Sequence, residues 1–251
     1  MSDEGARAAQ LLRTGEMSDA RFDGLLSEHA RRQSRRFWTC VEAATTASEW
    51  LAEVGVERLL DVGSGVGKFC CIASLMLGRR VWGLERRGEL VFESRRLAQR
   101  LGAEVVVIEG ALTQVDPRRF DAFYFFNPFG EYLLPPEERY DASPTSAEEY
   151  VSNARLVEQW LRAAPAGTTV LTFNGLGGRI PLSFSVHRTR CIDRNVLRLW
   201  RKDRPDEGLD AQVELDGEIV AASRLRRLAQ HTSFSDTALV RLLCEPPVEP
   251  R

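Results

Sequence analysis

The sequence contains few of the residues that build metal centres and disulfide frameworks. Five cysteines and three histidines occur among its 251 residues, and no two cysteines form a C-x-x-C pair. Cys70 and Cys71 are adjacent within a predicted helix, where they fit small packing residues. The histidines at 29, 187 and 231 stand apart from any cysteine or acidic motif. Because a metal site needs clustered ligands, we expect none.

Long apolar runs and a strong net charge are also missing. No stretch approaches the length of a membrane span, and the acidic start Met1–Glu4 lacks the basic and apolar regions of a signal peptide. We therefore expect a cytoplasmic protein without a membrane partner. The formal net charge of −2 argues against a general nucleic-acid binder. With 43% hydrophobic and 28% charged residues, the composition is that of an ordinary globular protein.

The most informative segment that is present is LLDVGSGVGKF, residues 59–69. An apolar run ends in Asp61, three glycines follow at every second position, and a helix-like segment comes next. This order predicts a strand, a tight turn and a helix start that bring the backbone close to a nucleotide-like ligand. Glycine suits the turn because a Cβ would block the ligand or forbid a positive φ. The spacing differs from the G-x-G-x-x-G of dinucleotide-binding proteins, so a nicotinamide-dependent oxidoreductase is the least favoured interpretation.

The same segment resembles motif I of the class I S-adenosylmethionine-dependent methyltransferases, whose first strand ends in D/E-x-G-x-G-x-G. The resemblance implies S-adenosyl-L-methionine as the cofactor and a Rossmann-like α/β fold. In that fold a seven-stranded, mostly parallel sheet has the strand order 3-2-1-4-5-7-6 and carries helices on both faces.

Short apolar segments alternate with helical ones from residue 56 onward, which predicts βαβ units and a parallel sheet. The predicted strands are 58–62, 80–84, 104–108, 121–126 and 168–173, followed by an antiparallel hairpin of 183–192 and 196–201. The predicted helices are 66–77, 88–101 and one that ends at Ala164 and is capped by Ser143, Thr145 or Ser146. We divide the chain into an N-terminal helical extension (1–54), a methyltransferase domain (55–202) and a C-terminal extension (203–251) with a hairpin signal at Asp216-Gly217.

The N-terminal extension is predicted to hold two polar helices up to residue 36. A third helix is predicted to begin at a capping box, Thr39–Glu42, and to end at Gly55. The cluster Arg31–Arg36 fits a solvated helix end, or alternatively a patch for an anionic substrate or a docking partner. Phe37 and Trp38 fit packing under the following helix, or a segment that folds over the cofactor.

Candidate cofactor-binding residues follow the predicted strands, because ligands of open α/β sheets bind beyond the carboxyl ends of the strands. Asp61 is placed to orient the glycine loop or, through water, to bind the ammonium of the methionine moiety. Glu85 ends the second strand, where a carboxylate can accept hydrogen bonds from both ribose hydroxyls. The remaining candidates around the glycine loop are Gly63, Ser64, Gly65 and Gly67.

A further contact, to adenine, is expected after the third strand. The methyltransferase family often has an acid here, but in this sequence the position falls on Gly110, which has no side chain. Glu109 is one possible substitute, and the backbone near Ala111 is another. We keep Glu109, Gly110 and Ala111 as candidate cofactor contacts.

The fourth strand ends in Asn127-Pro128-Phe129, the predicted catalytic segment. It partly resembles the N-P-P-Y motif of amino-group methyltransferases, and it resembles the N-x-F segment of the disruptor-of-telomeric-silencing lysine methyltransferases, which lack a SET domain. Asn127 Oδ1 and the Pro128 carbonyl are placed to accept hydrogen bonds from an amine, and Asn127 also to contact the cofactor. Phe129 and Tyr132 are placed to wall the pocket and attract a cationic group.

The sequence therefore predicts an N-methyltransferase whose acceptor is an amine of a protein lysine or of a small molecule. One alternative is methylation of a nucleic-acid base flipped against Asn127-Pro128, although the missing second proline and the balanced charge count against it. Another is a non-catalytic module that binds the cofactor. A lid over the site and a dimer contact are both compatible with residues 1–36 and 203–251.

Overall fold

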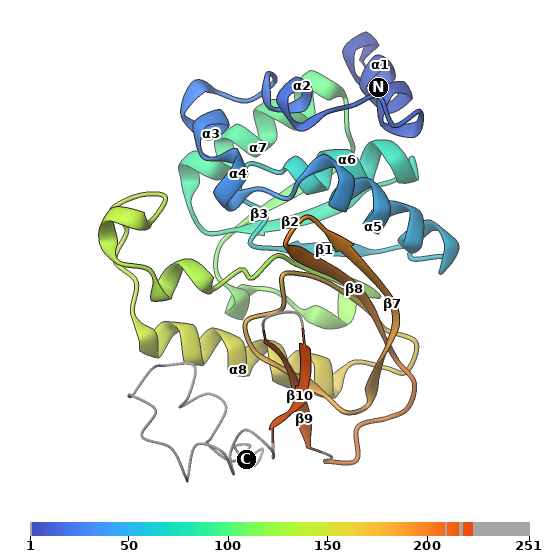
Figure 1. Ribbon diagram of the computed structural model, residues 1–251, viewed down its shortest axis with the longest axis vertical. Helices are drawn as coiled ribbons and strands as arrows, with labels where there is room; N and C mark the ends of the chain where they lie inside the picture. Colours follow the sequence, from blue (N-terminus) through green and yellow to red (C-terminus); the bar gives the residue numbers. More distant parts are fainter. Residues whose placement is uncertain (1, 209, 216–217, 223–251) are drawn as a thin grey trace.

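A seven-stranded sheet forms the centre of the molecule (Figure 1). The computed structural model describes residues 2–208, 210–215 and 218–222. The strands of this sheet are β1 (Leu59–Val62), β2 (Val81–Glu85), β3 (Val105–Glu109), β4 (Ala122–Phe125), β5 (Thr169–Phe173), β7 (Phe184–Ile192) and β8 (Asn195–Lys202). Their order is β3-β2-β1-β4-β5-β8-β7, with β8 antiparallel to β5 and β7 antiparallel to β8. The predicted Rossmann-like fold and strand order are confirmed, because β7 and β8 are the sixth and seventh strands of the predicted sheet and β6 belongs to a separate sheet.

The side chains of β1 show why this strand lies at the centre. All four of its residues are buried, as expected for a parallel strand covered on both faces. Leu59 belongs to one apolar core and Leu60 and Val62 to the other. Asp61 therefore points to the same face as Leu59, because successive side chains of a strand alternate.

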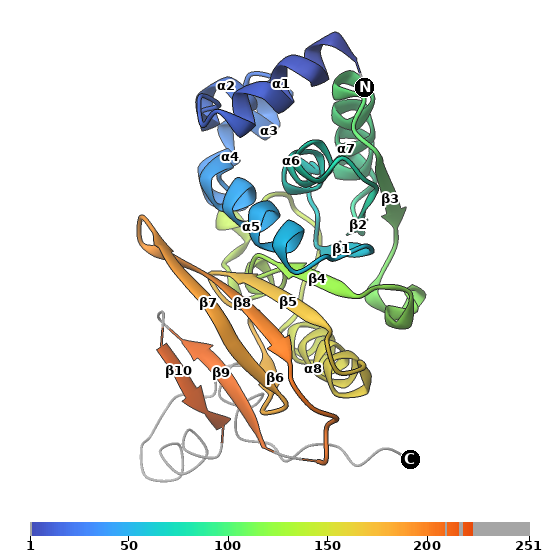
Figure 2. The same cartoon turned by 90° about the vertical axis from the view of Figure 1, so that its right-hand side faces the viewer.

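Two helical layers cover the two faces of the sheet (Figure 2). On one face lie α6 (Lys68–Leu77) and α7 (Gly88–Leu101), which end at left-handed Gly78 and Gly102 as predicted. On the other lies α8 (Ala147–Ala163), which begins at Ser146 with a capping box to Glu149. Among the described residues, no helix combines the length and apolar character needed to cross a membrane.

The N-terminal region holds more helices than the two predicted. They are α1 (Asp3–Arg13), α2 (Asp19–Asp23), α3 (Glu28–Arg32) and α4 (Ser34–Phe37), followed by α5 (Val41–Glu53). Three of the first four begin at a serine whose hydroxyl accepts a backbone N–H, namely Ser2, Ser18 and Ser27. Each of these serines starts a new helix, so the region contains several short helices where the sequence predicted two longer polar ones.

The capping box predicted at Thr39–Glu42 was wrong. Cys40 is the N-cap residue of α5 and its side chain makes no capping bond. The Thr39 hydroxyl instead lies 2.9 Å from the Tyr124 hydroxyl within the core. Asp19 Oδ1 accepts the Val41 N–H at 2.9 Å, so the cap is supplied by another helix. Sequence spacing cannot show such a distant cap.

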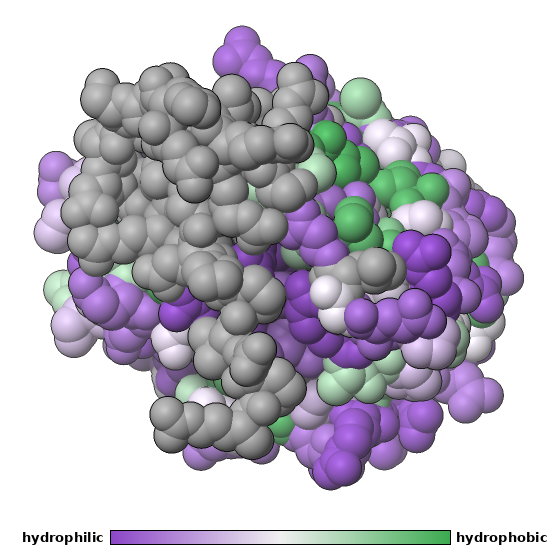
Figure 3. Space-filling view, turned by 90° about the horizontal axis from the view of Figure 1, so that it is seen from below, coloured by the Kyte–Doolittle hydropathy of each residue, from purple (hydrophilic) through white to green (hydrophobic). Residues whose placement is uncertain are grey.

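A second, three-stranded sheet was not predicted. It consists of β6 (Arg179–Pro181), β9 (Ala211–Leu215) and β10 (Glu218–Ala221) in the order β10-β9-β6. Strands β9 and β10 pair as the hairpin predicted there, and its turn residues 216–217 lie outside the described residues. Figure 3 views this end of the molecule, where hydrophilic side chains dominate the described surface and apolar ones form a small group.

Candidate active site

A cavity of about 390 Å³ lies beyond the carboxyl ends of the central strands. Its walls come from the glycine loop, the end of β2, the segment after β3, the segment after β4 and the connection between α4 and α5. The predicted site residues that line it are Gly63, Gly65, Glu85, Gly110, Ala111, Asn127, Pro128 and Phe129. The fold thus brings together residues from four separate strand ends, as the sequence predicts.

The three loop glycines each have a positive φ, with 78° at Gly63, 53° at Gly65 and 72° at Gly67. Each also lies against another part of the chain. A Cβ on Gly63 would lie 3.0 Å from Pro128 Cβ, and a Cβ on Gly65 would lie 2.5 Å from Trp38 Cζ3. A Cβ on Gly67 would overlap the hydroxyl of a serine in α7. Glycine is therefore required here by backbone conformation and by close packing within the protein.

Glu85 is the carboxylate that fixes the loop. Its side chain is buried, and Oε2 accepts the Gly65 N–H at 3.0 Å. Oε1 accepts the N–H groups of Arg86 and Arg87, both at 2.9 Å. A carboxylate has about four acceptor positions, so these three bonds leave one at Oε2. The geometry thus has room for one further hydroxyl at Glu85, whereas the sequence suggested two.

Asp61 lies beneath the glycine loop and does not line the large cavity. With Ser64, Lys68 and Trp38 it lines a neighbouring cavity of about 30 Å³, the size of a single water molecule. Burial raises the pKa of Asp61 to about 7, although the Cys70 thiol donates a hydrogen bond to it at 3.2 Å. The Ser64 hydroxyl is buried and has no hydrogen-bond partner among the described residues.

The segment after β3 places its three candidate residues differently. Gly110 and Ala111 line the large cavity, and the Ala111 N–H donates to Gln114 Oε1 at 2.8 Å. Glu109 does not line it. Its carboxylate is half exposed and lies 3.7 Å from Arg95 of α7. Of the two substitutes for the missing acid, the backbone is the one that faces the cavity.

Asn127 follows β4 in a left-handed conformation, with a φ of 37°. Its N–H donates to the Gly175 carbonyl at 3.1 Å, which ties the end of β4 to the turn after β5. The side-chain amide lies between Gly130 and Gly177, since a Cβ on either glycine would overlap it. The amide is therefore held in one place in the cavity wall.

The aromatic residues after Asn127 are less available to a ligand than the sequence suggests. Phe129 is only 5% exposed and packs edge-on against Tyr132 and Tyr150. The guanidinium of Arg86 lies over the Tyr132 ring, 5.1 Å from its centroid. The Tyr132 ring was predicted to attract a cationic acceptor, but the Arg86 guanidinium already lies over it.

Arg87 holds the connection after β4 in place, and sequence reasoning missed it. It forms ion pairs with Glu131 at 2.6 Å and with Asp141 at 3.3 Å. Burial is the largest single influence and lowers the pKa of Arg87, but the hydrogen bond to Glu131 and the charges of Glu131, Glu85 and Asp141 together outweigh it, so the net shift is upward. Glu131 also accepts the Tyr140 N–H at 2.6 Å. Paired arginines after a strand resemble a solvated helix start, so no sequence signal marked them.

Part of the arginine cluster Arg31–Arg36 does reach the site. Arg35 and Arg36 line the large cavity, whereas Arg32 pairs with Glu28 within its own helix. Arg36 forms an ion pair with Glu138 at 2.5 Å, across to the connection after β4. Phe37 and Trp38 line the same cavity, so the alternative in which this segment covers the site matches their position.

The described residues contain no group of three or more His, Cys, Asp or Glu side chains arranged to hold a metal ion.

Comparison with known proteins supports the fold. The family model of protein-L-isoaspartate (D-aspartate) O-methyltransferase matches residues 39–115. No curated protein is close enough in sequence to count as a relative. The matched region contains the glycine loop and Glu85 and stops before β4, so it includes none of the predicted catalytic segment.

Solved structures share the fold at low sequence identity. A putative O-methyltransferase from Klebsiella pneumoniae has a TM-score of 0.54 at 13% identity, covering 78% of this chain and 95% of its own. An O-methyltransferase from Bacillus cereus, solved with S-adenosylhomocysteine, has a TM-score of 0.51 at 12% identity, covering 77% and 96%. An RNA methyltransferase from Salinibacter ruber has a TM-score of 0.46 at 20% identity, covering 66% and 96%.

The chain therefore has the fold of the class I S-adenosylmethionine-dependent methyltransferases, and its residues 39–115 match a methyltransferase family model. A shared fold does not determine the acceptor.

Proposed function

We propose that this protein transfers the methyl group of S-adenosylmethionine to an amine nitrogen, on a protein lysine or on a small molecule. The observation that carries the proposal is the placement of Asn127-Pro128. Pro128 lies against Gly63 of the glycine loop, and the Asn127 amide is fixed in the wall of the same cavity. Hydrogen-bond acceptors for an amine thus lie directly beside the cofactor loop.

The cofactor is proposed to extend along the large cavity, from the end next to the small Asp61 cavity to Ala111. Glu85 would bind one ribose hydroxyl with its remaining acceptor position, and the backbone of Gly110 and Ala111 would border adenine. At the other end, a water molecule in the small cavity beside Asp61 and Ser64 would link the methionine ammonium to the buried Asp61 carboxylate. The glycine loop lies between these two ends.

The charges around the cavity favour a neutral amine. Arg35, Arg36, Arg86 and Arg87 are all among the lining residues, and of these Arg36 and Arg87 are paired with carboxylates. The two lining carboxylates, Glu85 and Glu131, are already hydrogen-bonded within the protein. Nearby positive charge lowers the pKa of an amine, and only the neutral amine has the lone pair needed for attack.

The chain's own residues would act mainly by orientation. Bound S-adenosylmethionine supplies a methyl group on a positively charged sulfur, which is already activated. Asn127 Oδ1 and the Pro128 carbonyl would accept the amine N–H groups and direct the nitrogen lone pair. Holding reactants in line is worth a large part of a barrier. An amine that arrives protonated must first lose its proton to water, because only the neutral form has a lone pair for attack on the methyl.

The resemblance to the disruptor-of-telomeric-silencing group supports a lysine as the acceptor. To test this, the purified protein is incubated with methyl-labelled S-adenosylmethionine and a fractionated cell lysate. Label in precipitated protein that protease removes and nuclease leaves would support a lysine acceptor. Label confined to the filtrate would identify a small-molecule acceptor, and label removed by nuclease would contradict the amine proposal.

The role of Asn127 is tested by Asn127→Gly, because glycine keeps the left-handed backbone while it removes the amide. We expect kcat to fall roughly 100-fold, the order expected when a reactant loses its alignment, with little change in the Kd for S-adenosylhomocysteine. Asp193→Gly is a matched control, since Asp193 is also left-handed, with a φ of 52°, and lies in the β7–β8 turn. Equal losses of turnover and cofactor affinity in Asn127→Gly would contradict the assigned role.

A further inference from the structure

Trp38 rests on the middle glycine of the cofactor loop. A Cβ on Gly65 would lie 2.5 Å from Cζ3 and 2.9 Å from Cε3 of the indole. Trp38 and its neighbour Phe37 each line both the large cavity and the water-sized cavity beside Asp61. The indole therefore stands where these two cavities meet.

Contacts on several sides fix the orientation of this indole. Its Nε1–H donates to the Ala30 carbonyl at 2.8 Å. Its ring centroid lies 5.5 Å from that of Tyr140 and 6.1 Å from that of Phe37. Tyr140 belongs to the connection after β4, so the indole joins the N-terminal helices to the opposite wall of the cavity.

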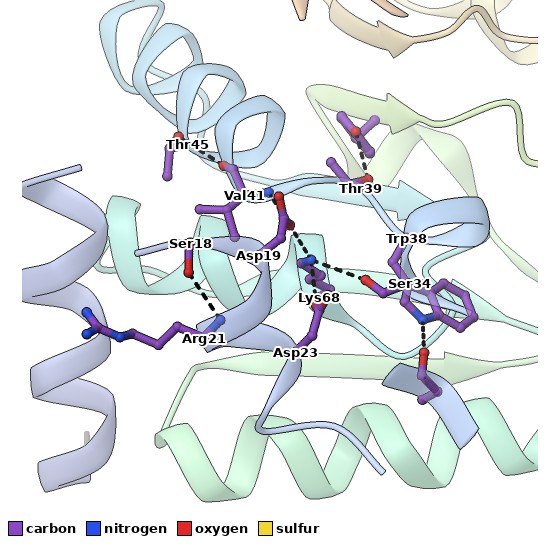
Figure 4. A network of polar contacts seen from close by, with 12 residues as sticks. Ser18, Asp19, Arg21, Asp23, Ser34, Trp38, Thr39, Val41, Thr45 and Lys68 are labelled. Atoms are coloured by element: carbon purple, nitrogen blue, oxygen red, sulfur yellow. Dashed lines mark hydrogen bonds and ion pairs between the residues drawn. The ribbon is translucent and has the colours of Figure 1, made fainter. Parts of the chain in front are cut away.

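An ion cluster around the buried Lys68 anchors the segment that carries Trp38 (Figure 4). Lys68, directly after the last loop glycine, is 2% exposed. Its Nζ lies 2.6 Å from Asp19 Oδ1 and 2.7 Å from Asp23 Oδ1, and 3.5 Å from the hydroxyl of Ser34. The carboxylate of Asp19 also accepts the first N–H of α5.

This cluster connects α2, α4 and α5 to the start of α6, and Trp38 lies in the short connection between α4 and α5. A charged lysine is costly to bury unless it is paired. The pairing thus makes the N-terminal helices a fixed part of the glycine-loop region.

We propose that Trp38 is a cofactor-positioning residue whose indole forms the wall against the methionine part of S-adenosylmethionine, and that the Lys68 cluster holds it there. The inference rests on the proposed function, since it assigns a second wall to the same cofactor. It places the N-terminal helices within the binding site, and it gives a role to a residue outside the strand ends that usually carry ligands of this fold.

The test is the affinity for S-adenosylhomocysteine, measured by titration calorimetry on the full chain. Trp38→Ala is expected to weaken binding at least about tenfold, the order of one lost aromatic contact, and Trp38→Phe to restore most of it. Trp50→Ala is the control: Trp50 is also half-buried, lies in α5 beneath Arg188 and lines neither cavity.

Asp23→Ala tests the anchor, because Asp23 lines neither cavity and its carboxylate is paired with Lys68. We expect weaker binding in Asp23→Ala, and no additional loss when it is combined with Trp38→Ala, because coupled residues are non-additive. Unfolding midpoints are recorded for every variant. If Trp38→Ala does not fold, Trp38→Leu replaces it and must bind more weakly than Trp38→Phe.

The outcomes separate the two proposals. A wild-type protein that binds no S-adenosylhomocysteine would overturn the proposed function. A folded Trp38→Ala or Trp38→Leu variant that binds as tightly as wild type would overturn the role of Trp38 and leave the proposed function standing.

Discussion

Among single residues, Asp61 shows how the sheet changes the chemistry of a side chain. It follows two leucines in β1 and points to the face covered by α6, where the Cys70 thiol is its hydrogen-bond donor. Burial is the main reason that its pKa rises from 3.8 to about 7. The carboxyl is therefore partly protonated at neutral pH, which is unusual for an aspartate.

This raised pKa predicts that stability falls as the pH rises. Between about pH 4 and pH 7 the folded protein holds a proton at Asp61 that the unfolded chain has already released. Each unit of difference corresponds to about 1.4 kcal/mol, so this group lowers the free energy of unfolding by a few kcal/mol between about pH 4 and pH 8. Urea unfolding of the wild type and of Asp61→Asn should show this loss in the wild type alone.

The same titration predicts the pH dependence of cofactor binding. If the methionine ammonium is bound through water to Asp61, the ionised carboxylate binds it better than the neutral acid. The Kd for S-adenosylhomocysteine should then fall as the pH rises from 6 to 8. Asp61→Asn should remove this dependence, and an unchanged slope in that variant would show that another group titrates.

The candidate residues also show how far a sequence carries such an analysis. Gly63, Gly65 and Glu85 line the cavity, because motif spacing and a strand end fix their positions locally. Glu109 does not line the cavity. Successive side chains of a strand point to opposite faces, so a difference of one residue at the end of β3 decides whether a side chain faces the cavity. Arg87 could not be predicted, since its partners Glu131 and Asp141 follow far along the chain.

At the scale of elements, the best predictions concern helices with local end signals. α7 begins and ends where predicted, because an amphipathic repeat is followed by Gly102, and α8 has its cap at one of the three expected positions. β6 was missed because it is three residues long, ends in Pro181 and pairs with β9 some thirty residues away. Proline is tolerated there since β6 is an edge strand.

The cap of α5 by Asp19 gives a prediction about stability. Asp19→Ala removes both the acceptor for the Val41 N–H and one partner of Lys68. We expect a loss of about 2–3 kcal/mol, of which a helix cap contributes about 1 kcal/mol. Asp19→Asn keeps an oxygen acceptor and should lose less. Urea unfolding measures both, and equal losses would show that the cap contributes little.

For the molecule as a whole, the site is closed by two segments far apart in the sequence. Residues 28–40 and 130–141 meet above the cavity through the Arg36–Glu138 ion pair and the packing of Trp38 on Tyr140. Both segments supply lining residues, so a ligand in the cavity lies against both of them.

Ligand binding should therefore be visible far from the strand ends. At a hundredfold excess of S-adenosylhomocysteine over its Kd, the folded state gains about 2.7 kcal/mol, which raises the unfolding temperature. Amide hydrogen exchange should slow in residues 28–40 and 130–141, with little change in α8. Protection limited to the glycine loop would contradict a cavity closed by these two segments.

The strand order has a consequence for the order of events during translation. The lining of the cavity begins at Arg35 and ends at Asn195, and β5 gains its second neighbour only when β8 arrives. A chain that leaves the ribosome from its N-terminus therefore exposes the glycine loop long before it can complete the walls around it. Tight cofactor binding can stabilise the finished protein but cannot guide the nascent chain through its first four strands.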